Sequence, residues 1–372
     1  MSRPIRAWIH LDALSHNLGI ARRHAKNSKV YAVVKANAYG HGIERVYPAL
    51  QQADGFALLD LAEAKRLRAL GWQGDILLLE GIFSAQDLQD CHDFNFSFTV
   101  HNTAQIEWLQ QFQSSHPTAR FHIFVKMNAG MNRLGFAPEN YAQAWKRLLE
   151  LKIVASLTHM MHFSDADGER FGISGIQQQY SQFQHIIQAF PASVTVSHSA
   201  AILRHSHELH SDIVRGGIML YGSSPDYPKH SSQSWQLQPA MSLRTEIISI
   251  QTLVAGQSVG YGSNFVAEYP MRIGIAACGY ADGYQRTSPT GTPVLVNDCK
   301  TRLIGRVSMD MLAVDLTHVT NADIGAEVVL WGKSAAGTLL SIDEVAHTSG
   351  TVGYELMCAV TQRVPFSIAA TE

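Results

Sequence analysis

The sequence predicts an α/β fold in which an N-terminal (β/α)8 TIM barrel, residues 11–230, is followed by a C-terminal mostly β domain, residues 231–372. Up to about residue 225, short apolar segments rich in β-branched residues alternate with amphipathic stretches. Beyond residue 230, strand-like segments follow one another, and glycine or asparagine turns separate several of them. The length of 372 residues also suggests two domains, because it is too long for one small core.

The barrel prediction rests on eight short apolar segments that are typical of strands buried in a parallel sheet. These segments are Val30–Val34, Gly55–Leu59, Ile76–Leu79, Phe96–Val100, Phe121–Met127, Ile153–Met161, Val194–Ser197 and Asp212–Arg215 together with Ile218–Tyr221. Amphipathic stretches predict helices between most of them, over Leu61–Leu70, Ala104–Phe112, Glu139–Leu149 and Ile176–Phe190. An open doubly wound sheet would need fewer strands and a glycine-rich phosphate turn, and no GxGxxG follows the first strand.

Six segments predict strands in the C-terminal domain, which we expect to be a small barrel or a sandwich. They are Arg244–Val254, Arg272–Ala277, Pro293–Val296, Arg302–Val307, Met311–Leu316 and Glu327–Leu330. Ile342–Ser349 has a helical pattern, and Glu355–Val360 predicts one further helical turn. The polar segment Ser231–Pro239 is interpreted as a linker. Residues 1–10 are expected to form a strand that packs with the C-terminal domain.

Composition and charge exclude several classes of protein. A hydrophobic content of 46% with 16% charged residues is typical of a soluble globular protein. The formal net charge of −2 gives no electrostatic reason to expect nucleic acid or an anionic membrane as a partner. The four cysteines are scattered, which indicates reduced thiols, and no apolar segment resembles a signal peptide or a membrane span. We therefore expect a cytoplasmic protein.

The first predicted strand ends in a lysine, Lys35, and the turn-rich stretch Ala36–Gly42 follows it. An ammonium group is costly to bury unless it is paired or neutral. A partly desolvated lysine can instead form a Schiff base with an aldehyde, because its amine is more readily deprotonated. The alternative is a lysine that leaves the strand for solvent, as most charged residues at strand ends do.

The C-terminal ends of the strands face the active site in (β/α)8 barrels. The residues predicted at these ends are Lys35, Tyr39, Lys126, Met131, Asn132, Arg133, His162, His198, Ser199, Arg215, Gly216, Gly217 and Ile218. Two lysines, two arginines and two histidines in one mouth imply an anionic ligand, because the cations repel one another. Backbone N–H groups and a hydroxyl could hold a phosphate at the small residues of the last two loops, Ser199, Ala200, Gly216 and Gly217. A phosphate together with a Schiff-base lysine indicates pyridoxal 5′-phosphate (PLP).

Eight motifs, spread over nearly the whole chain, resemble those of the alanine racemase family, a fold-type III PLP-dependent family. They are AVVKANAYGHG (Ala32–Gly42), KMNAGMNRLGF (Lys126–Phe136), HFSDAD (His162–Asp167), VRGGIMLYG (Val214–Gly222), VGYG (Val259–Gly262), GYADGY (Gly279–Tyr284), SMDM (Ser308–Met311) and GTVGYELM (Gly350–Met357). The resemblance implies an isomerase that interconverts L-alanine and D-alanine, a peptidoglycan precursor. The sequence leaves open whether the enzyme feeds cell-wall synthesis or degrades D-alanine.

The resemblance implies that Lys35 binds PLP covalently. The residues it places on the PLP phosphate are Tyr39, Ser199, Gly217, Ile218 and Tyr354. Arg133 would bond the phenolic oxygen of PLP and help to bind the substrate, His162 would lie against the pyridine ring, and Arg215 would face the ring nitrogen. Lys126 matches a position that is often carbamylated in this family.

The resemblance also implies a homodimer with shared active sites. Tyr261 would be the second catalytic base, and the backbone of Met309 would help to hold the substrate carboxylate. Both residues would reach the site from the partner subunit. The residues implied to line the substrate corridor are Tyr280, Arg286 and Asp310. Elsewhere in the GYADGY motif, Asp282–Gly283 is interpreted only as a tight turn.

Racemisation needs one base on each face of a planar carbanion and an electron sink such as PLP. By the resemblance, Lys35 serves the D-face proton and Tyr261 the L-face proton. Because a free phenol ionises only near pH 10, Tyr261 needs nearby cations to act as a base at pH 7, and Arg286 is a candidate. Arg215 could only donate to the ring nitrogen, which would leave that nitrogen unprotonated and favour racemisation over transamination.

Two positions depart from the family pattern. His198 stands before Ser199, where asparagine or a small residue is usual, and Asn128–Gly130 replaces Asp-Thr-Gly or Asn-Ser-Gly. The alternatives are a racemase for serine or with broad specificity, a decarboxylase of the same fold type, and a non-catalytic PLP-binding protein. The VGYG and SMDM motifs oppose the second alternative, and the C-terminal domain opposes the third. The 18 histidines follow no metal-ligand spacing, so we expect no catalytic metal.

Overall fold

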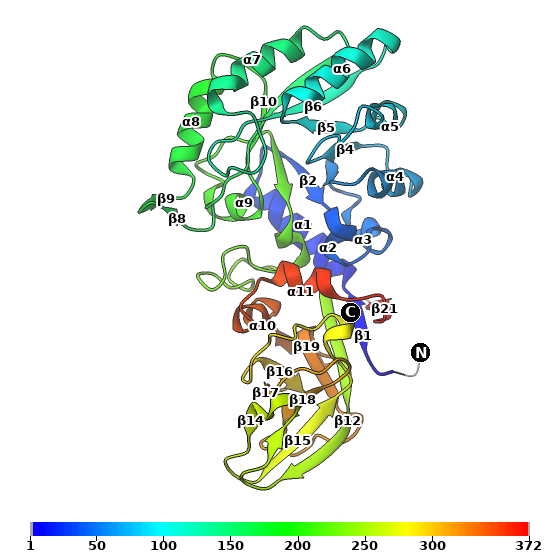
Figure 1. The fold of residues 1–372 in the computed structure, drawn as a ribbon, viewed down its shortest axis with the longest axis vertical. Coiled ribbons are helices and arrows are strands. Elements are labelled where there is room, and N and C mark those ends of the chain that lie inside the picture. The colour runs from blue at the N-terminus through cyan, green and yellow to red at the C-terminus, as the bar shows by residue number, and fades with distance from the viewer. Residues whose placement is uncertain (1–2, 371–372) are drawn as a thin grey trace. The chain divides into compact units, whose positions relative to one another are not determined.

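The computed structural model describes residues 3–370, and the chain divides into two compact units (Figure 1). The barrel unit contains Leu18–Ala38 and Tyr47–Leu220. The β unit contains the residues up to Asn17, Tyr39–Val46 and the residues from Tyr221 onward. The two units therefore interleave along the chain. The domain boundaries predicted after residues 10 and 230 remain a proposal.

The barrel unit is built on a parallel sheet with the strand order β10-β7-β6-β5-β4-β3-β2-β11. The strands are β2 (Lys29–Val33), β3 (Gly55–Leu58), β4 (Asp75–Leu78), β5 (Ser97–Val100), β6 (Phe121–Lys126), β7 (Val154–Met160), β10 (Ser193–Thr195) and β11 (Ile213–Gly216). The sheet closes between its first and last strands, because the Asp212 N–H donates to the Val194 carbonyl at 2.8 Å and the Arg215 N–H to the Ser197 carbonyl at 2.9 Å. The predicted (β/α)8 barrel is confirmed.

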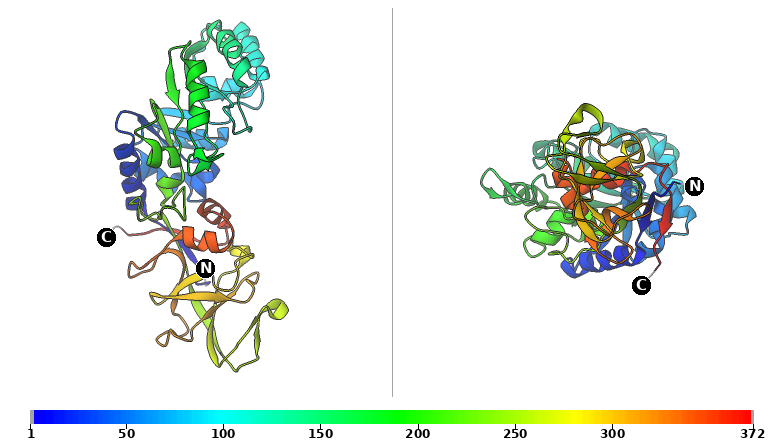
Figure 2. Two further views of the ribbon diagram at one scale, coloured as in Figure 1. Left: turned by 90° about the vertical axis from the view of Figure 1, so that its left-hand side faces the viewer. Right: turned by 90° about the horizontal axis from the view of Figure 1, so that it is seen from below.

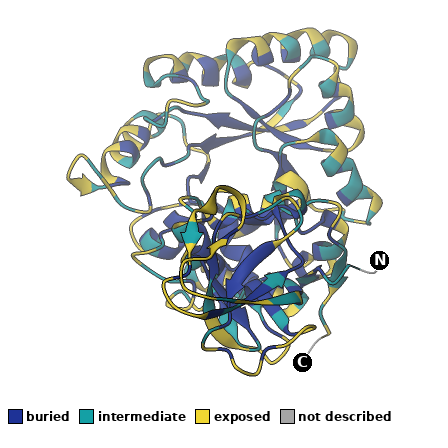
Figure 3. Cartoon of the chain, turned by 60° about the horizontal axis from the view of Figure 1, so that its bottom comes forward, coloured by how far each residue is buried: buried dark blue, intermediate teal, exposed yellow. Residues whose placement is uncertain are grey.

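Helices cover the outside of this sheet. They are α1 (Leu11–His24), α3 (Ile43–Leu50), α4 (Leu61–Ala69), α5 (Asp87–Asp93), α6 (Thr103–Ser115), α7 (Pro138–Leu149), α8 (Gln177–Ile187) and α9 (Ser199–His205), with a short hairpin of β8 (Glu169–Arg170) and β9 (Ile173–Ser174) before α8. Helices α6, α7 and α8 lie side by side (Figures 1 and 2). The helices expose one face and bury the other against strands that are mostly buried (Figure 3).

Side-chain caps fix where two of these helices begin. The Asp60 carboxylate accepts hydrogen bonds from the Ala62 and Glu63 N–H groups at 2.7 and 3.1 Å, at the start of α4. The Asn102 side chain accepts one from the Gln105 N–H at 3.0 Å, at the start of α6. Each cap satisfies donors that a helix leaves unpaired in its first turn. Aromatic rings pack between the strands and these helices: Phe98 and Phe121 meet edge to face at 5.4 Å, and Phe121 lies 5.7 Å from Phe112 on α6.

The β unit holds a sheet in which six strands form a closed ring. Its members are β12 (Met241–Leu253), β15 (Met271–Ala276), β16 (Pro293–Val296), β17 (Cys299–Ile304), β18 (Leu312–Asp315) and β19 (Glu327–Lys333). Their order is β19-β16-β17-β18-β15-β12, and β12 also pairs with β19, which closes the ring. The long strand β12 reaches both neighbours because its register shifts near Leu243 and near Ile247. Of the two predicted architectures, a small barrel is therefore the one observed.

Further elements extend this small barrel. Strand β1 (Arg6–Ile9) pairs antiparallel with β12 and parallel with β21 (Phe366–Ile368), so both chain ends join the sheet. The remaining elements are β13 (Ser258–Val259), β14 (Phe265–Val266), β20 (Leu339–Leu340), α10 (Ile342–Thr348) and α11 (Gly353–Ala359). In the core, Trp331 is fully buried and stacks on Tyr284 with 6.2 Å between ring centroids.

One predicted strand segment is wrong. Ile218–Tyr221, which we expected to continue the eighth strand, is the 3₁₀ helix η1. A short apolar run has no periodicity that distinguishes a strand from a buried helical turn. Among the described residues, no helix is long and apolar enough to cross a membrane.

Candidate active site

A buried arginine stands at the end of the last barrel strand. Arg215, on β11, is 3% exposed. Its guanidinium donates to the Thr195 hydroxyl at 2.5 Å, to the Met161 carbonyl at 2.9 Å and to the Val196 carbonyl at 3.4 Å. Its Nε–H has no acceptor among residues 3–370. Burial lowers the pKa of Arg215 to about 10, so the guanidinium stays charged at neutral pH.

A second buried cation, Lys126, ends strand β6 and is 6% exposed. Its pKa is lowered to about 8, mainly by burial and also by the charges of Arg215, Arg133 and Lys35, while Glu80 acts in the opposite direction. Lys126 also lines a small cavity with Arg133 and His162. The structure thus brings together four of the predicted cations: Lys126, Arg215, Arg133 and Lys35. A single carboxylate, Glu80, acts on Lys126, so the arrangement is electrostatically unfavourable without a bound anion.

The two predicted histidines lie against each other. The rings of His162 and His198 stack with 4.4 Å between their centroids. The pKa of His198 is lowered to about 4 and that of His162 well below its ordinary value, in both cases mainly by burial and partly by the charge of Arg215. Both imidazoles are therefore neutral at pH 7. The unusual residue before Ser199 has become a packing partner of His162, not a further charge.

A small cradle of polar groups joins the loops after β10 and β11. Ser199 begins α9, and its hydroxyl accepts from the Gly217 N–H at 2.9 Å and from the Met219 N–H at 3.3 Å. The Ile218 N–H, at the start of η1, has no acceptor within the described part of the chain. A hydroxyl and unpaired backbone N–H groups are the donors that a phosphate needs.

Lys35 opens a turn that the sequence did not reveal. The segment α2 (Lys35–Tyr39) is left-handed, with φ of 53°, 52°, 56° and 51° at Ala36, Asn37, Ala38 and Tyr39. This conformation costs on the order of 1–2 kcal/mol for each residue that has a Cβ. Neighbours hold it: the Asn37 N–H donates to the Glu63 carboxylate at 2.6 Å, and the Arg66 guanidinium donates to the Asn37 side chain at 2.9 Å. The strand-end lysine therefore projects from a braced, strained turn.

In the β unit, three tyrosines gather around the end of this turn. The ring of Tyr39 lies 4.6 Å from that of Tyr221 and 6.0 Å from that of Tyr354. Burial raises the pKa of Tyr39, so its phenol stays a hydrogen-bond donor. The following residue has to be glycine, because Gly40 has a φ of +82° and a Cβ there would lie 2.3 Å from the Met357 carbonyl oxygen.

The other predicted residues of the β unit lie on its surface. Tyr261 is 71% exposed on the turn η2 (Tyr261–Ser263), and Met309 is 52% exposed. Tyr280 and Arg286 are also exposed. Asp310 differs from them, because its carboxylate accepts from the Arg363 guanidinium at 2.7 Å. The Tyr261 phenol has no partner in the region from residue 3 to residue 370.

Comparisons with known proteins cover both units. The family model of the alanine racemase N-terminal domain matches residues 9–225, and that of the alanine racemase C-terminal domain matches residues 240–368. The chain belongs to the alanine racemase family. It is 66% identical to the alanine racemase of Acinetobacter baumannii (strain SDF) over 98% of this chain and 99% of that protein. It is 58% identical to that of Polaromonas naphthalenivorans (strain CJ2) over 99% of this chain and 100% of that protein.

Solved structures agree with this assignment. The biosynthetic alanine racemase from Pseudomonas aeruginosa superposes with a TM-score of 0.92 at 41% identity, covering 99% of this chain and 100% of that one. The alanine racemase from Acinetobacter baumannii superposes with a TM-score of 0.90 at 35% identity, with the same coverage. The protein is thus an enzyme of the alanine racemase family, with that family's barrel and C-terminal β domain.

Sequence reasoning missed residues that lie beside the predicted site residues in the structure. Thr195 orients Arg215, and its only signal was its place at the end of a barrel strand. Arg306 lies against the turn that carries Tyr261, since a Cβ on Gly262 would be 3.5 Å from its Nη1. Arg306 stands two residues before the SMDM segment, so its position could have marked it. The departure at Asn128 has a local explanation, because its side chain accepts from the Gly130 and Asn132 N–H groups and so shapes the loop.

The buried ammonium of Lys126 predicts a pH-dependent stability. Between pH 8 and 10.5 the unfolded state still binds the proton that folded Lys126 has lost, so wild-type stability rises with pH in this window. The variant Lys126→Met lacks this contribution. The free energy of unfolding of Lys126→Met minus that of the wild type should therefore fall by on the order of 3 kcal/mol between pH 8 and pH 10.5. Urea unfolding of ligand-free protein in CO2-free buffer at several pH values measures it, and a pH-independent difference would contradict the prediction.

Proposed function

We propose that this protein is a PLP-dependent alanine racemase that interconverts L-alanine and D-alanine, with Lys35 and Tyr261 as its two bases. Membership of the alanine racemase family supports the reaction. The observation that carries the cofactor assignment is the cluster of the buried cations Lys126 and Arg215 with the exposed Arg133, beside the strained turn of Lys35. Such a cluster fits a ligand that brings negative charge to the barrel mouth. The cytoplasmic location expected from the sequence stays a prediction.

The described residues fit PLP at each of its polar ends. The cradle at Ser199, with the unpaired Ile218 N–H, suits the phosphate. The unpaired Nε–H of Arg215 is the donor available to the ring nitrogen, since the terminal nitrogens already donate to the Thr195 hydroxyl and to backbone carbonyls. Lys35 supplies the amine that the cofactor aldehyde needs. When bound, PLP would delocalise the negative charge left on Cα after the α-proton is removed.

The two bases divide the proton transfers between them. The Lys35 amine takes the α-proton of D-alanine, and the Tyr261 phenolate, from the partner subunit of a homodimer, takes the α-proton of L-alanine. Each returns a proton to the opposite face in the reverse direction. Arg133 and the Met309 N–H bind the substrate carboxylate, and Tyr280 and Arg286 line the corridor by which alanine arrives.

Arg215 influences whether bound PLP supports racemisation or transamination. Its guanidinium remains protonated at pH 7, so it can donate to the ring nitrogen but cannot accept a proton from it. With PLP bound, this donation would leave the ring nitrogen unprotonated and the cofactor a weaker electron sink. The residue therefore favours racemisation over transamination.

The direct test is D-alanine formation from L-alanine by purified protein with added PLP. We expect the variant Lys35→Ala to lose activity by at least about 10³-fold, because it removes both the covalent attachment point and one base. Chiral chromatography of the products measures it. Full activity in Lys35→Ala would rule out the proposed role of this lysine, and no D-alanine from wild-type protein that binds PLP would rule out the substrate.

The shared site predicts complementation between two inactive variants. Lys35→Ala and Tyr261→Phe homodimers should both be inactive, whereas a mixed dimer contains one site with both native bases. Random exchange of equal amounts makes about half of the dimers mixed, and each mixed dimer has one native site out of two. We therefore expect about a quarter of wild-type activity. Subunit exchange is checked by native mass spectrometry, and inactive mixed dimers would show that Tyr261 does not act from the partner subunit.

We further propose that Lys126 is carbamylated. With its pKa near 8, a substantial fraction of Lys126 is the neutral amine that attacks CO2 at neutral pH. The carbamate would replace a buried cation by an anion that pairs with Arg133. Carbon-13 NMR with labelled bicarbonate should show a carbamate resonance that Lys126→Met lacks, and its absence at saturating bicarbonate would disprove the modification.

A further inference from the structure

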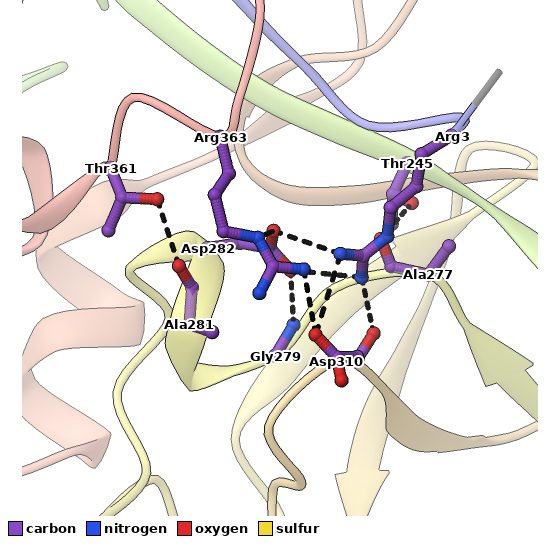
Figure 4. A network of polar contacts seen from close by, with 9 residues as sticks. All are labelled: Arg3, Thr245, Ala277, Gly279, Ala281, Asp282, Asp310, Thr361 and Arg363. Carbon is purple, nitrogen blue, oxygen red and sulfur yellow. Dashed lines mark hydrogen bonds and ion pairs between the residues drawn. The ribbon is translucent and has the colours of Figure 1, made fainter. Parts of the chain in front are cut away.

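Two arginines and two aspartates form a closed ring of ion pairs in the β unit (Figure 4). Asp282 is fully buried, and the Arg3 guanidinium meets both of its carboxylate oxygens, at 3.1 and 3.0 Å. The Arg363 guanidinium lies 3.3 Å from Asp282 and donates to the Asp310 carboxylate at 2.7 Å. Arg3 completes the ring at 3.8 Å from the Asp310 carboxylate and also donates to the Asp310 backbone carbonyl. Two positive charges balance two negative ones.

Asp282 connects this ring to the turn Gly279–Gly283. Its carboxylate also accepts from the Gly279 N–H at 2.9 Å, which closes the turn on itself. Thr361 holds the turn from outside, because its N–H donates to the Asp282 carbonyl at 3.1 Å and its hydroxyl to the Ala281 carbonyl at 2.9 Å. A buried carboxylate without these cations would be strongly destabilising.

The turn Gly279–Gly283 also binds the loop Ser308–Met311. The Tyr280 N–H donates to the Ser308 carbonyl at 3.1 Å, and the Ala281 N–H donates to the Met309 carbonyl at 3.0 Å. The contact is so close that a Cβ on Gly279 would lie 2.4 Å from both carbonyl oxygens. Arg3 binds the next carbonyl, that of Asp310. The carbonyl groups of Ser308, Met309 and Asp310 are thus all hydrogen-bonded, although their loop belongs to no helix or strand.

This arrangement leaves the Met309 N–H available. Its carbonyl is bound, its side chain is half exposed, and its N–H has no acceptor anywhere in residues 3–370. The Asp310 carboxylate stands one residue away, and unpaired it would repel any carboxylate that approached this N–H. Arg363 removes that repulsion by pairing with Asp310.

We propose that Arg363 and Arg3, bridged through Asp282 and Asp310, are positioning residues that hold the Ser308–Met311 loop and neutralise Asp310, so that the Met309 N–H can receive the substrate carboxylate. This inference rests on the proposed function, in which Met309 binds alanine. Asp282 thereby has a role beyond its turn. Asp310 acts as an ion-pair partner of the loop, in addition to its predicted place in the substrate corridor.

Steady-state kinetics of the dimeric holoenzyme test the proposal. In Arg363→Met, we expect the KM for L-alanine to rise by about tenfold with kcat within about twofold, because an uncompensated carboxylate then opposes substrate binding. Arg363→Lys should recover most of the affinity. The double variant Arg363→Met/Asp310→Asn should bring KM back to within about threefold of wild type, since it removes the repelling charge as well.

Arg302→Met is the matched control. Arg302 pairs with Asp315 at 3.1 Å in the same unit, and its side chain is 43% exposed against 42% for Arg363. We expect it to leave KM unchanged. If Arg363→Met keeps the wild-type KM, or if the control raises KM equally, the positioning role is overturned. A double variant that is worse than Arg363→Met would overturn the neutralisation of Asp310.

Hydrogen exchange separates this inference from the proposed function. In Arg363→Met, peptides that span Ser308–Met311 should exchange at least about fivefold faster than in wild type, whereas Arg302→Met should not change them. If the wild type does not racemise alanine but the exchange result holds, the proposed function fails and the loop restraint stands. Unchanged exchange in Arg363→Met overturns the restraint whether or not the wild type is a racemase.

Discussion

The accumulation of positive charge at the mouth of the barrel is the constraint on which the site depends. Arg215 is buried and fixed by neutral acceptors, so none of its hydrogen bonds cancels its charge. Burial, together with this repulsion, keeps His162 and His198 neutral and lowers the pKa of Lys126 to about 8. These adjustments reduce the repulsion but do not remove it. Charged groups with shifted pKa values in such a cluster are typical of functional sites.

Backbone strain is concentrated at the same place. The left-handed turn after Lys35 persists because Glu63 and Arg66, both on α4, bind the backbone and side chain of Asn37. The position of the lysine therefore depends on a helix that follows the next strand in the chain. Strain of this kind is found where a side chain has to be held in one orientation, and it is tolerated only when neighbours determine the conformation.

In the β unit, paired charges hold an exposed loop in place. Its exposed residues Tyr261 and Met309 lie on short turns and loops, which have few backbone hydrogen bonds of their own. The loop of Met309 takes its order from Asp282 and from arginines near the two ends of the chain. In the barrel the positive charges around Lys126 exceed the one carboxylate that acts on it, whereas in the β unit two arginines pair with two aspartates.

The sequence by itself determined the elements and their order. The eight barrel strands lie within one or two residues of the predicted segments. The local pattern of hydrophobic residues is sufficient to predict buried strands and the amphipathic helices between them. The motifs likewise marked Lys35, Arg215 and Tyr261 as candidates. Tertiary structure decided the rest. The 3₁₀ turn at Ile218–Tyr221, the hand of the turn after Lys35 and the pairing of Arg3 with Asp282 depend on contacts between distant residues, and local patterns carry no information about such contacts.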